Sequence, residues 1–301
     1  QVEGYETRPG QIEMLRAVVT AFNRGHHLLV EAGTGVGKSL AYLLPAVLWS
    51  RLNDVPVVVS TNTRNLQTQL MRKDLPAVQR MVADDRPSAA PPRTALIKGR
   101  SNYLCLRRLG QFMDHWPVDL ERRELRQFAR ALCWAPRTED GDLDTLGGGA
   151  GIEPGFLAQL AMPGEDCPGR ACRLYRRCFL QKARERSLRA DIVIANHALV
   201  FAEMDNPGVS LPPHAQIVFD EAHNLEEAAT RYFAIECSPM RLNQLLRRLA
   251  SGSGARRRGT LERLRRRLTA AGDAPRQKRL RHDIRQTLAS VDRLRASGRA
   301  L

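Results

Sequence analysis

Residues 31–39, EAGTGVGKS, decide the fold of this chain. An apolar run from Leu28 to Val30 precedes them and is short enough to form a buried strand, and residues 40–44 can begin a helix. A strand, a glycine-rich turn and a helix form the context of a phosphate-binding loop, where backbone N–H groups and the helix N-terminus surround phosphate oxygens. The sequence therefore predicts a nucleoside triphosphate site at this loop.

Two side chains of the loop have predicted roles. Lys38 would reach the β- and γ-phosphates, and the Ser39 hydroxyl would hold Mg²⁺. The first glycine of the usual pattern is replaced by Ala32, which the backbone tolerates where φ stays negative. The residues predicted to bind the phosphates are Ala32, Gly33, Thr34, Gly35, Val36, Gly37, Lys38 and Ser39.

A polar segment stands before the first predicted helix, whose apolar positions recur at helical spacing over residues 12–22. The Gln11 amide could bond a donor and an acceptor on the adenine edge, and Tyr5 or Arg8 could stack on the ring. The alternative is an ordinary polar surface. Arg8 and Gln11 are thus candidate ATP-binding residues.

A second motif supplies the acids that the phosphate loop requires. Residues 217–219 are predicted to form a strand that ends at Asp220. Asp220 would hold the Mg²⁺ that bridges the phosphates, Glu221 would orient and deprotonate the attacking water, and His223 would sense the γ-phosphate. The predicted catalytic residues are Lys38, Asp220, Glu221 and His223.

Further strands are predicted at residues 55–59, 94–97 and 192–194, which together indicate an α/β fold with a parallel sheet. Hydroxyl and amide side chains follow the strand at 55–59, where ligands of open α/β sheets bind. Thr61, Thr63 and Arg64 are therefore candidates for contacts with phosphates; the alternative is a helix cap formed by Ser60 or Thr61. The default interpretation of His197, after the strand at 192–194, is a structural histidine.

Four cysteines form a candidate metal site. Cys167, Cys172 and Cys178 are clustered, and Cys105 lies upstream, whereas Cys133 and Cys237 stand apart. The gaps are wider than in most structural zinc sites and suit a [4Fe–4S] cluster better, although zinc or unconnected buried cysteines remain open. Residues 120–133 are predicted to be helical, and the acidic, glycine-rich stretch 137–155 is predicted to be flexible.

Charge and hydropathy narrow the class of protein. The segment from Arg241 to the end holds 18 of the 47 Lys and Arg residues but 4 of the 32 Asp and Glu residues, which suggests a phosphate backbone as partner or a solvated arginine-rich surface. The apolar run from Leu40 to Trp49 is interrupted by Pro45 and is shorter than the roughly 20 residues of a membrane span. A cytoplasmic protein with no membrane partner is expected, and the start at Gln1 suggests a piece of a longer one.

Taken together, these motifs resemble the XPD-like iron–sulfur DNA helicases of superfamily 2, in particular the bacterial DinG and YoaA branch. The matching segments are residues 8–11, 32–39, 60–70, 98–105 with the cysteine cluster, 195–199 and 220–223. The resemblance implies a RecA-like motor domain at 1–97 and 188–238, an iron–sulfur insertion at 98–187 bound through Cys105, Cys167, Cys172 and Cys178, and a partial helical arch at 239–301. It also implies ATP, Mg²⁺ and a [4Fe–4S] cluster as cofactors.

The implied activity is ATP-driven 5′–3′ movement on single-stranded DNA with unwinding of forked duplexes, in bacterial DNA repair or replication. The resemblance also implies that Thr61, Thr63 and Arg64 contact the DNA. The family also needs a second motor domain with a Gln-x-x-Gly-Arg-x-x-Arg motif, which does not follow His223. Loss of such an arginine costs about 10³–10⁵ in rate in comparable enzymes, so weak hydrolysis by this chain alone is expected. The alternatives are an ATP- and nucleic-acid-binding regulatory module without helicase activity and a nuclease-coupled or RNA-directed relative.

Overall fold

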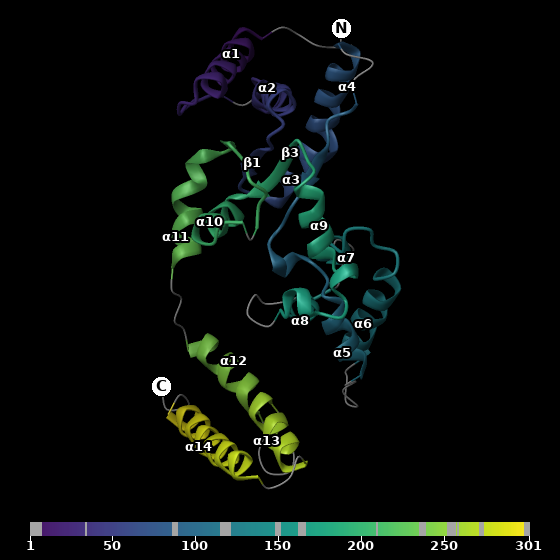
Figure 1. Cartoon of the computed structure of the whole chain (residues 1–301), viewed down its shortest axis with the longest axis vertical. Helices are drawn as coiled ribbons and strands as arrows, with labels where there is room; N and C mark the ends of the chain where they lie inside the picture. The colour runs from purple at the N-terminus through teal and green to yellow at the C-terminus, as the bar shows by residue number, and fades with distance from the viewer. Residues whose placement is uncertain are drawn as a thin grey trace. The chain divides into compact units, whose positions relative to one another are not determined.

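The computed structural model describes residues 8–33, 35–85, 90–114, 122–147, 152–161, 167–208, 210–234, 239–251, 257, 259–270 and 274–297. The chain divides into two compact units, residues 1–233 and residues 234–301. Figure 1 shows the course of the chain and the labels of its elements.

The first unit is built on a parallel sheet with the strand order β2-β3-β1-β4 among the described residues. All four strands lie where the sequence predicts them, at β1 Val57–Thr61, β2 Thr94–Leu96, β3 Ile192–Asn196 and β4 Gln216–Phe219. The β1 and β3 runs are β-branched and almost completely buried, as expected for the centre of a parallel sheet. Parallel pairing gathers the carboxyl ends of β1, β3 and β4 at one edge.

The predicted strand at Leu28–Val30 is wrong. Residues 26–33 have no regular secondary structure in this chain, and the Leu29 side chain is 92% exposed. An apolar run becomes a buried strand only where a neighbouring strand offers backbone partners. None of the four described strands pairs with this segment. A run of three apolar residues is therefore not enough to predict a strand.

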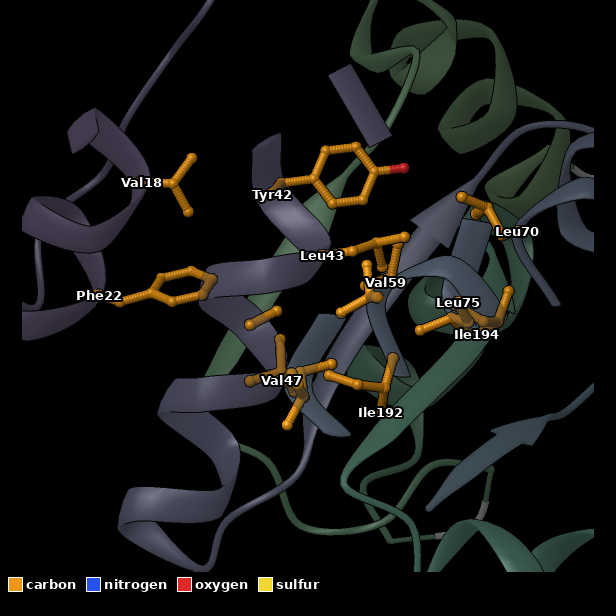
Figure 2. Packing of buried hydrophobic residues seen from close by; sticks show 14 residues of the cluster. Val18, Phe22, Tyr42, Leu43, Val47, Val59, Leu70, Leu75, Ile192 and Ile194 are labelled. Atoms are coloured by element: carbon orange, nitrogen blue, oxygen red, sulfur yellow. The ribbon is translucent and has the colours of Figure 1, made fainter. Parts of the chain in front are cut away.

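Helices cover both faces of the sheet. Val59, Ile192 and Ile194 point to the face covered by α2 and α4, where Leu43 and Val47 complete the core (Figure 2). The opposite face places Val58, Val193 and Ala195 against α10. The helices of this part are α1 Pro9–Arg24, α2 Lys38–Asn53, α3 Arg64–Gln69, α4 Leu75–Asp85, α10 His197–Asp205 and α11 Leu225–Phe233, with a π-helical turn at Leu70–Asp74.

Residues between β2 and β3 form a hydrophobic core of their own around Leu104, Phe128 and Leu160. Gly141 lies against this core in the left-handed conformation, with φ 67°. A Cβ at this position would lie 2.3 Å from the Phe179 ring, so both the backbone and the packing require glycine. The helices are α5 Leu106–Asp114, α6 Arg122–Trp134, α7 Leu143–Gly147, α8 Pro154–Leu160 and α9 Phe179–Ser187. The prediction of a flexible stretch at 137–155 is therefore wrong for its described part, where leucines of α7 are buried.

The second unit contains α12 Pro239–Leu249, α13 Thr260–Ala270 and α14 Pro275–Ser297. Leu246, Ile284 and Leu288 form its core. Glu262 is buried, and hydrogen bonds from Arg265 and Arg266 lower its pKa to about 2. Among the described helices, none is both long and apolar enough to cross a membrane.

Candidate nucleotide site and cysteine pocket

The phosphate loop is held by the start of α1. Gly35 and Gly37 adopt left-handed φ values of 82° and 87°, and Gly37 caps α2. The Gln11 Nε2 atom donates to the Gly37 carbonyl at 3.0 Å, so close that a Cβ on Gly37 would lie 2.2 Å from that nitrogen. The Arg8 guanidinium donates to the Gly35 carbonyl. Arg8 and Gln11, both predicted at the adenine ring, thus contact the loop itself. Tyr5 and Thr34 lie outside the described residues.

The structure brings Lys38 and Glu221 together across 183 positions of sequence, with Nζ 3.3 Å from Oε1. His223 Nδ1 lies 3.4 Å from the other oxygen of Glu221. Glu221 itself has φ 54°, a conformation that costs a residue with a side chain about 1–2 kcal/mol and that clusters at functional sites. The predicted base is therefore held in a strained turn beside the predicted phosphate-binding lysine.

Asp220 follows β4 directly, and its N–H donates to the Ser60 carbonyl at 2.8 Å. Burial raises the pKa of Asp220, the charge of Glu221 raises it further, and Lys38 opposes both effects. A divalent cation bound here would offset the cost of the buried carboxylate. Ser39 and Asp220 fit the Mg²⁺ site that the sequence predicts, and bound Mg²⁺ would neutralise phosphate charge there.

Tyr42 is a residue that the motifs did not reveal. It is buried, its hydroxyl faces Ser39 and Asp220, and no hydrogen bond of standard geometry satisfies that hydroxyl. Burial, and then the charge of Asp220, raise the pKa of Tyr42. The available signal was its spacing, since positions three and four residues after Ser39 and Lys38 lie on the same face of a helix.

His197 lies beneath the same edge of the sheet and is 1% exposed. Its Nδ1 atom is 2.7 Å from the Ser60 Oγ atom, which connects the end of β3 to β1. Burial lowers the pKa of His197 and favours the neutral ring, although the backbone of Asp220 opposes this. The structural role expected of this histidine agrees with these contacts, but its Nε2 atom has no hydrogen bond.

Cysteines from distant parts of the chain share one pocket, which is lined by Cys105, Cys167, Cys172 and Cys178. Two 3₁₀ turns, Gly169–Ala171 and Tyr175–Arg177, end at Cys172 and Cys178. No three described His, Cys, Asp or Glu side chains are close enough to hold a metal ion as they stand. Cys133 is exposed and does not line the pocket. Four thiols on a common pocket are nevertheless the donor set of a [4Fe–4S] cluster.

Arg184 lies beside this cysteine pocket. Burial and the charge of Arg100 lower its pKa, whereas Cys167 and Cys178 act in the opposite direction. Cations in such a position offset the negative charge that thiolates would carry. The arginine-rich surroundings noted in the sequence therefore include a side chain close to the thiols.

The three predicted DNA contacts differ in their surroundings. Thr61 is completely buried and does not present a surface to DNA. Thr63 caps α3 by accepting a hydrogen bond from the Leu66 N–H at 3.3 Å, so the alternative of a helix cap is correct but at a different residue. Arg64 is exposed and forms an ion pair with Asp144. Asp144 also accepts from Lys98 Nζ at 2.9 Å.

Comparison with known proteins agrees with this geometry. The model of the DEAD/DEAH box helicase family matches residues 8–81, which contain the phosphate loop and β1. Over 261 residues the chain is 40% identical to the ATP-dependent helicase DinG of Mycobacterium tuberculosis, covering 82% of this chain and 38% of that protein. Over 248 residues it is 36% identical to the ATP-dependent DNA helicase YoaA of Escherichia coli, covering 81% of this chain and 37% of that protein.

Residues 8–81 thus match the DEAD/DEAH box helicase family, and about four fifths of the chain is similar to helicases named DinG and YoaA. A relative in Bacillus subtilis, named 3′–5′ exonuclease DinG, is 32% identical over 252 residues, which are 82% of this chain and 26% of that protein. The chain thus spans well under half the length of the DinG and YoaA relatives it matches.

Proposed function

We propose that the protein containing this chain is an ATP-dependent DNA helicase that moves 5′ to 3′ on single-stranded DNA and unwinds forked duplexes in DNA repair or replication. The observation that carries the proposal is the approach of Lys38 to Glu221 at the carboxyl edge of the sheet. This pair combines a phosphate-binding cation with a carboxylate that can take a proton from water, as hydrolysis of a nucleoside triphosphate requires.

In this proposal residues 1–97 and 188–238 form the first motor domain. The loop residues 32–39 surround the phosphates, and Ser39 with Asp220 would hold Mg²⁺. Glu221 orients and deprotonates the attacking water, while His223, which contacts Glu221, responds to the γ-phosphate. The strained backbone of Glu221 supports this assignment, because strain of this kind clusters at active sites.

Residues 98–187 would form an iron–sulfur domain, and residues 239–301 would begin a helical arch. The separate core around Phe128 and the shared pocket of four cysteines support the first assignment. The three arginine-rich helices of the second unit support the second, because Arg side chains can contact the phosphates of DNA passing beside them.

Strand polarity is tested with the full-length protein on duplexes that carry either a 5′ or a 3′ single-stranded tail. We expect ATP-dependent unwinding of the 5′-tailed substrate only. Unwinding of only the 3′-tailed substrate would contradict the proposed direction, and DNA-stimulated hydrolysis without any unwinding would favour a regulatory module.

The cluster is tested by anaerobic purification followed by iron and sulfide assays and a visible absorption spectrum. Cys172→Ser should lose iron and sulfide, whereas Cys133→Ser, whose thiol lies outside the pocket, should retain both. Stoichiometric zinc without iron in the wild-type protein would exclude the iron–sulfur assignment.

A further inference from the structure

A polar pocket, separate from the cysteine pocket, opens at the carboxyl edge of the sheet. Its volume is about 430 Å³, within the range of small-molecule sites of roughly 300–1,000 Å³. Its wall comes from the segment after β1, from the junction of β3 and α10, from the turn after β4, and from α11. Figure 1 shows α10 and α11 as neighbours, consistent with their direct packing.

Three asparagines give this pocket both donors and acceptors. The Asn196 Oδ1 atom accepts from the Leu199 N–H at 2.9 Å, which leaves its NH₂ group available. The Asn224 NH₂ group donates to the Glu221 carbonyl at 3.2 Å, which leaves its Oδ1 atom available. Within the described part of the chain, the exposed Asn62 side chain makes no hydrogen bond. Asparagine amides bind base edges because they present a donor and an acceptor side by side.

An aromatic ring forms another side of the pocket. Tyr232 packs edge-on against Phe233 with ring centroids 4.9 Å apart, and lies 6.4 Å from the Phe201 ring. Its hydroxyl lies beside Asp205, which helps to fix the ring. A ring held in this way loses little conformational freedom when a planar ligand stacks on it.

The charges on the wall favour a neutral ligand. Arg231 and Glu227 form an ion pair at 2.5 Å, so the one arginine that lines the pocket among the described residues is already neutralised. His197 also lines this pocket, but it is almost completely buried and its Nδ1 atom is bonded to Ser60.

We infer that this pocket accepts one unpaired nucleobase of a single-stranded nucleic acid. The inference rests on the proposed function, in which a single strand passes Thr63 and Arg64, since Asn62 lies directly before them. The base stacks on Tyr232 and bonds the amides of Asn62, Asn196 and Asn224. Because Asn224 also contacts Glu221 and lies 3.0 Å from His223 Nε2, an occupied pocket touches the loop that carries the hydrolytic residues.

Fluorescence anisotropy with two labelled oligonucleotides of about 10 units tests the inference, one made of ordinary nucleotides and one made entirely of abasic sites with the same number of phosphates. The 301-residue chain should bind the ordinary strand about tenfold or more tightly than the abasic strand, because stacking contributes to affinity at each base. Tyr232→Ala and Asn62→Ala should reduce this ratio severalfold while leaving abasic binding unchanged. Tyr232→Phe keeps the ring and should keep the ratio.

Asn53→Ala removes an exposed asparagine outside the pocket and serves as the matched control. Equal losses for both oligonucleotides in the pocket variants would mean contact with the DNA backbone and would overturn the inference. An unchanged ratio in those variants would also overturn it, while leaving DNA binding intact. Failure of the wild-type chain to bind either strand would overturn the pocket, and failure of the full-length protein to bind as well would overturn the DNA-binding part of the proposed function.

Discussion

The phosphate loop and the loop after β4 meet where Lys38 pairs with Glu221, in the proposed nucleotide site, but different contacts hold them. Asp220 and Glu221 leave the end of a sheet strand, and a backbone hydrogen bond to Ser60 fixes the first of them. The phosphate loop has no paired strand before it, and the Arg8 and Gln11 side chains hold its backbone instead. The acids are thus positioned by the sheet, whereas the backbone of the phosphate loop is held by two side chains at the start of α1, the capping residue Arg8 and Gln11.

The largest effect is expected where the two loops touch. Glu221→Gln removes the proposed general base and should lower ATP turnover of the full-length protein by about 10²–10⁴-fold. Binding of ATP should persist, because the phosphate loop is unchanged. Phosphate release and nucleotide binding are measured side by side, with Glu226→Gln, an exposed acid of α11, as the control. Normal turnover of Glu221→Gln would rule out Glu221 as the base.

Removing the histidine beneath the acid loop should reduce stability. His197→Phe leaves the completely buried Ser60 hydroxyl without its partner, which costs about 1–3 kcal/mol of unfolding free energy. Denaturant unfolding followed by circular dichroism measures the loss, with the exposed His27→Phe as control. If His197→Phe has the same unfolding free energy as the wild-type chain, the contact between Ser60 and His197 does not stabilise the fold.

His197 also predicts a dependence on pH. Burial lowers its pKa in the folded chain, so the unfolded chain binds the proton more readily as the pH falls below about 6.5. The stabilising contribution of the neutral ring is therefore complete above that pH and decreases as the pH falls towards the folded pKa. Unfolding measured between neutral and mildly acidic pH should show this decrease in the wild-type chain, and His197→Phe should lack that part of it.

A smaller effect is expected at the phosphate loop. Gln11→Ala deletes the hydrogen bond to the Gly37 carbonyl, a loss of about 0.5–1.5 kcal/mol, which should weaken ATP binding roughly two- to tenfold. Isothermal titration calorimetry measures the affinity, and Gln286→Ala in the second unit is the matched control. If Gln11→Ala binds ATP as tightly as the wild-type chain, the loop keeps its shape without the Gln11 hydrogen bond.

The smallest effect concerns the exposed ion pair between Arg64 and Asp144. Asp144→Asn breaks this pair, while the buried Lys98 keeps Asp142 as its ion-pair partner. Affinity for single-stranded DNA should rise a few-fold, because the Arg64 guanidinium becomes available to a phosphate. Anisotropy titrations at several salt concentrations measure the affinity. Glu139→Gln is the control, because it also removes one negative charge, five positions earlier in the sequence. If both variants gain the same affinity for single-stranded DNA, the cause is the change in net charge and not the release of Arg64.

The sequence predicted the parts of this molecule that local patterns determine. Val57–Val59 and Ile192–Ile194 were predicted as strands because their β-branched runs suit a doubly covered sheet, and Lys38 and Glu221 were predicted because short motifs carry their chemistry. Leu28–Val30 was mispredicted because strand formation also needs a neighbour. Contacts between distant segments, such as those of Ser60 with His197 and of Arg64 with Asp144, had no local signal.

The pairing of β1 with β3 also determines which part of the chain can fold first. Val57 pairs with Ile192, so the whole cysteine-containing region must be synthesised before the central strands can meet. Closing such a long loop adds little to the free energy of folding, but contacts of high sequence separation form slowly. The core around Phe128 is made of residues much nearer in sequence and can collapse earlier. The insertion is therefore expected to fold as the chain leaves the ribosome, before the sheet that flanks it exists.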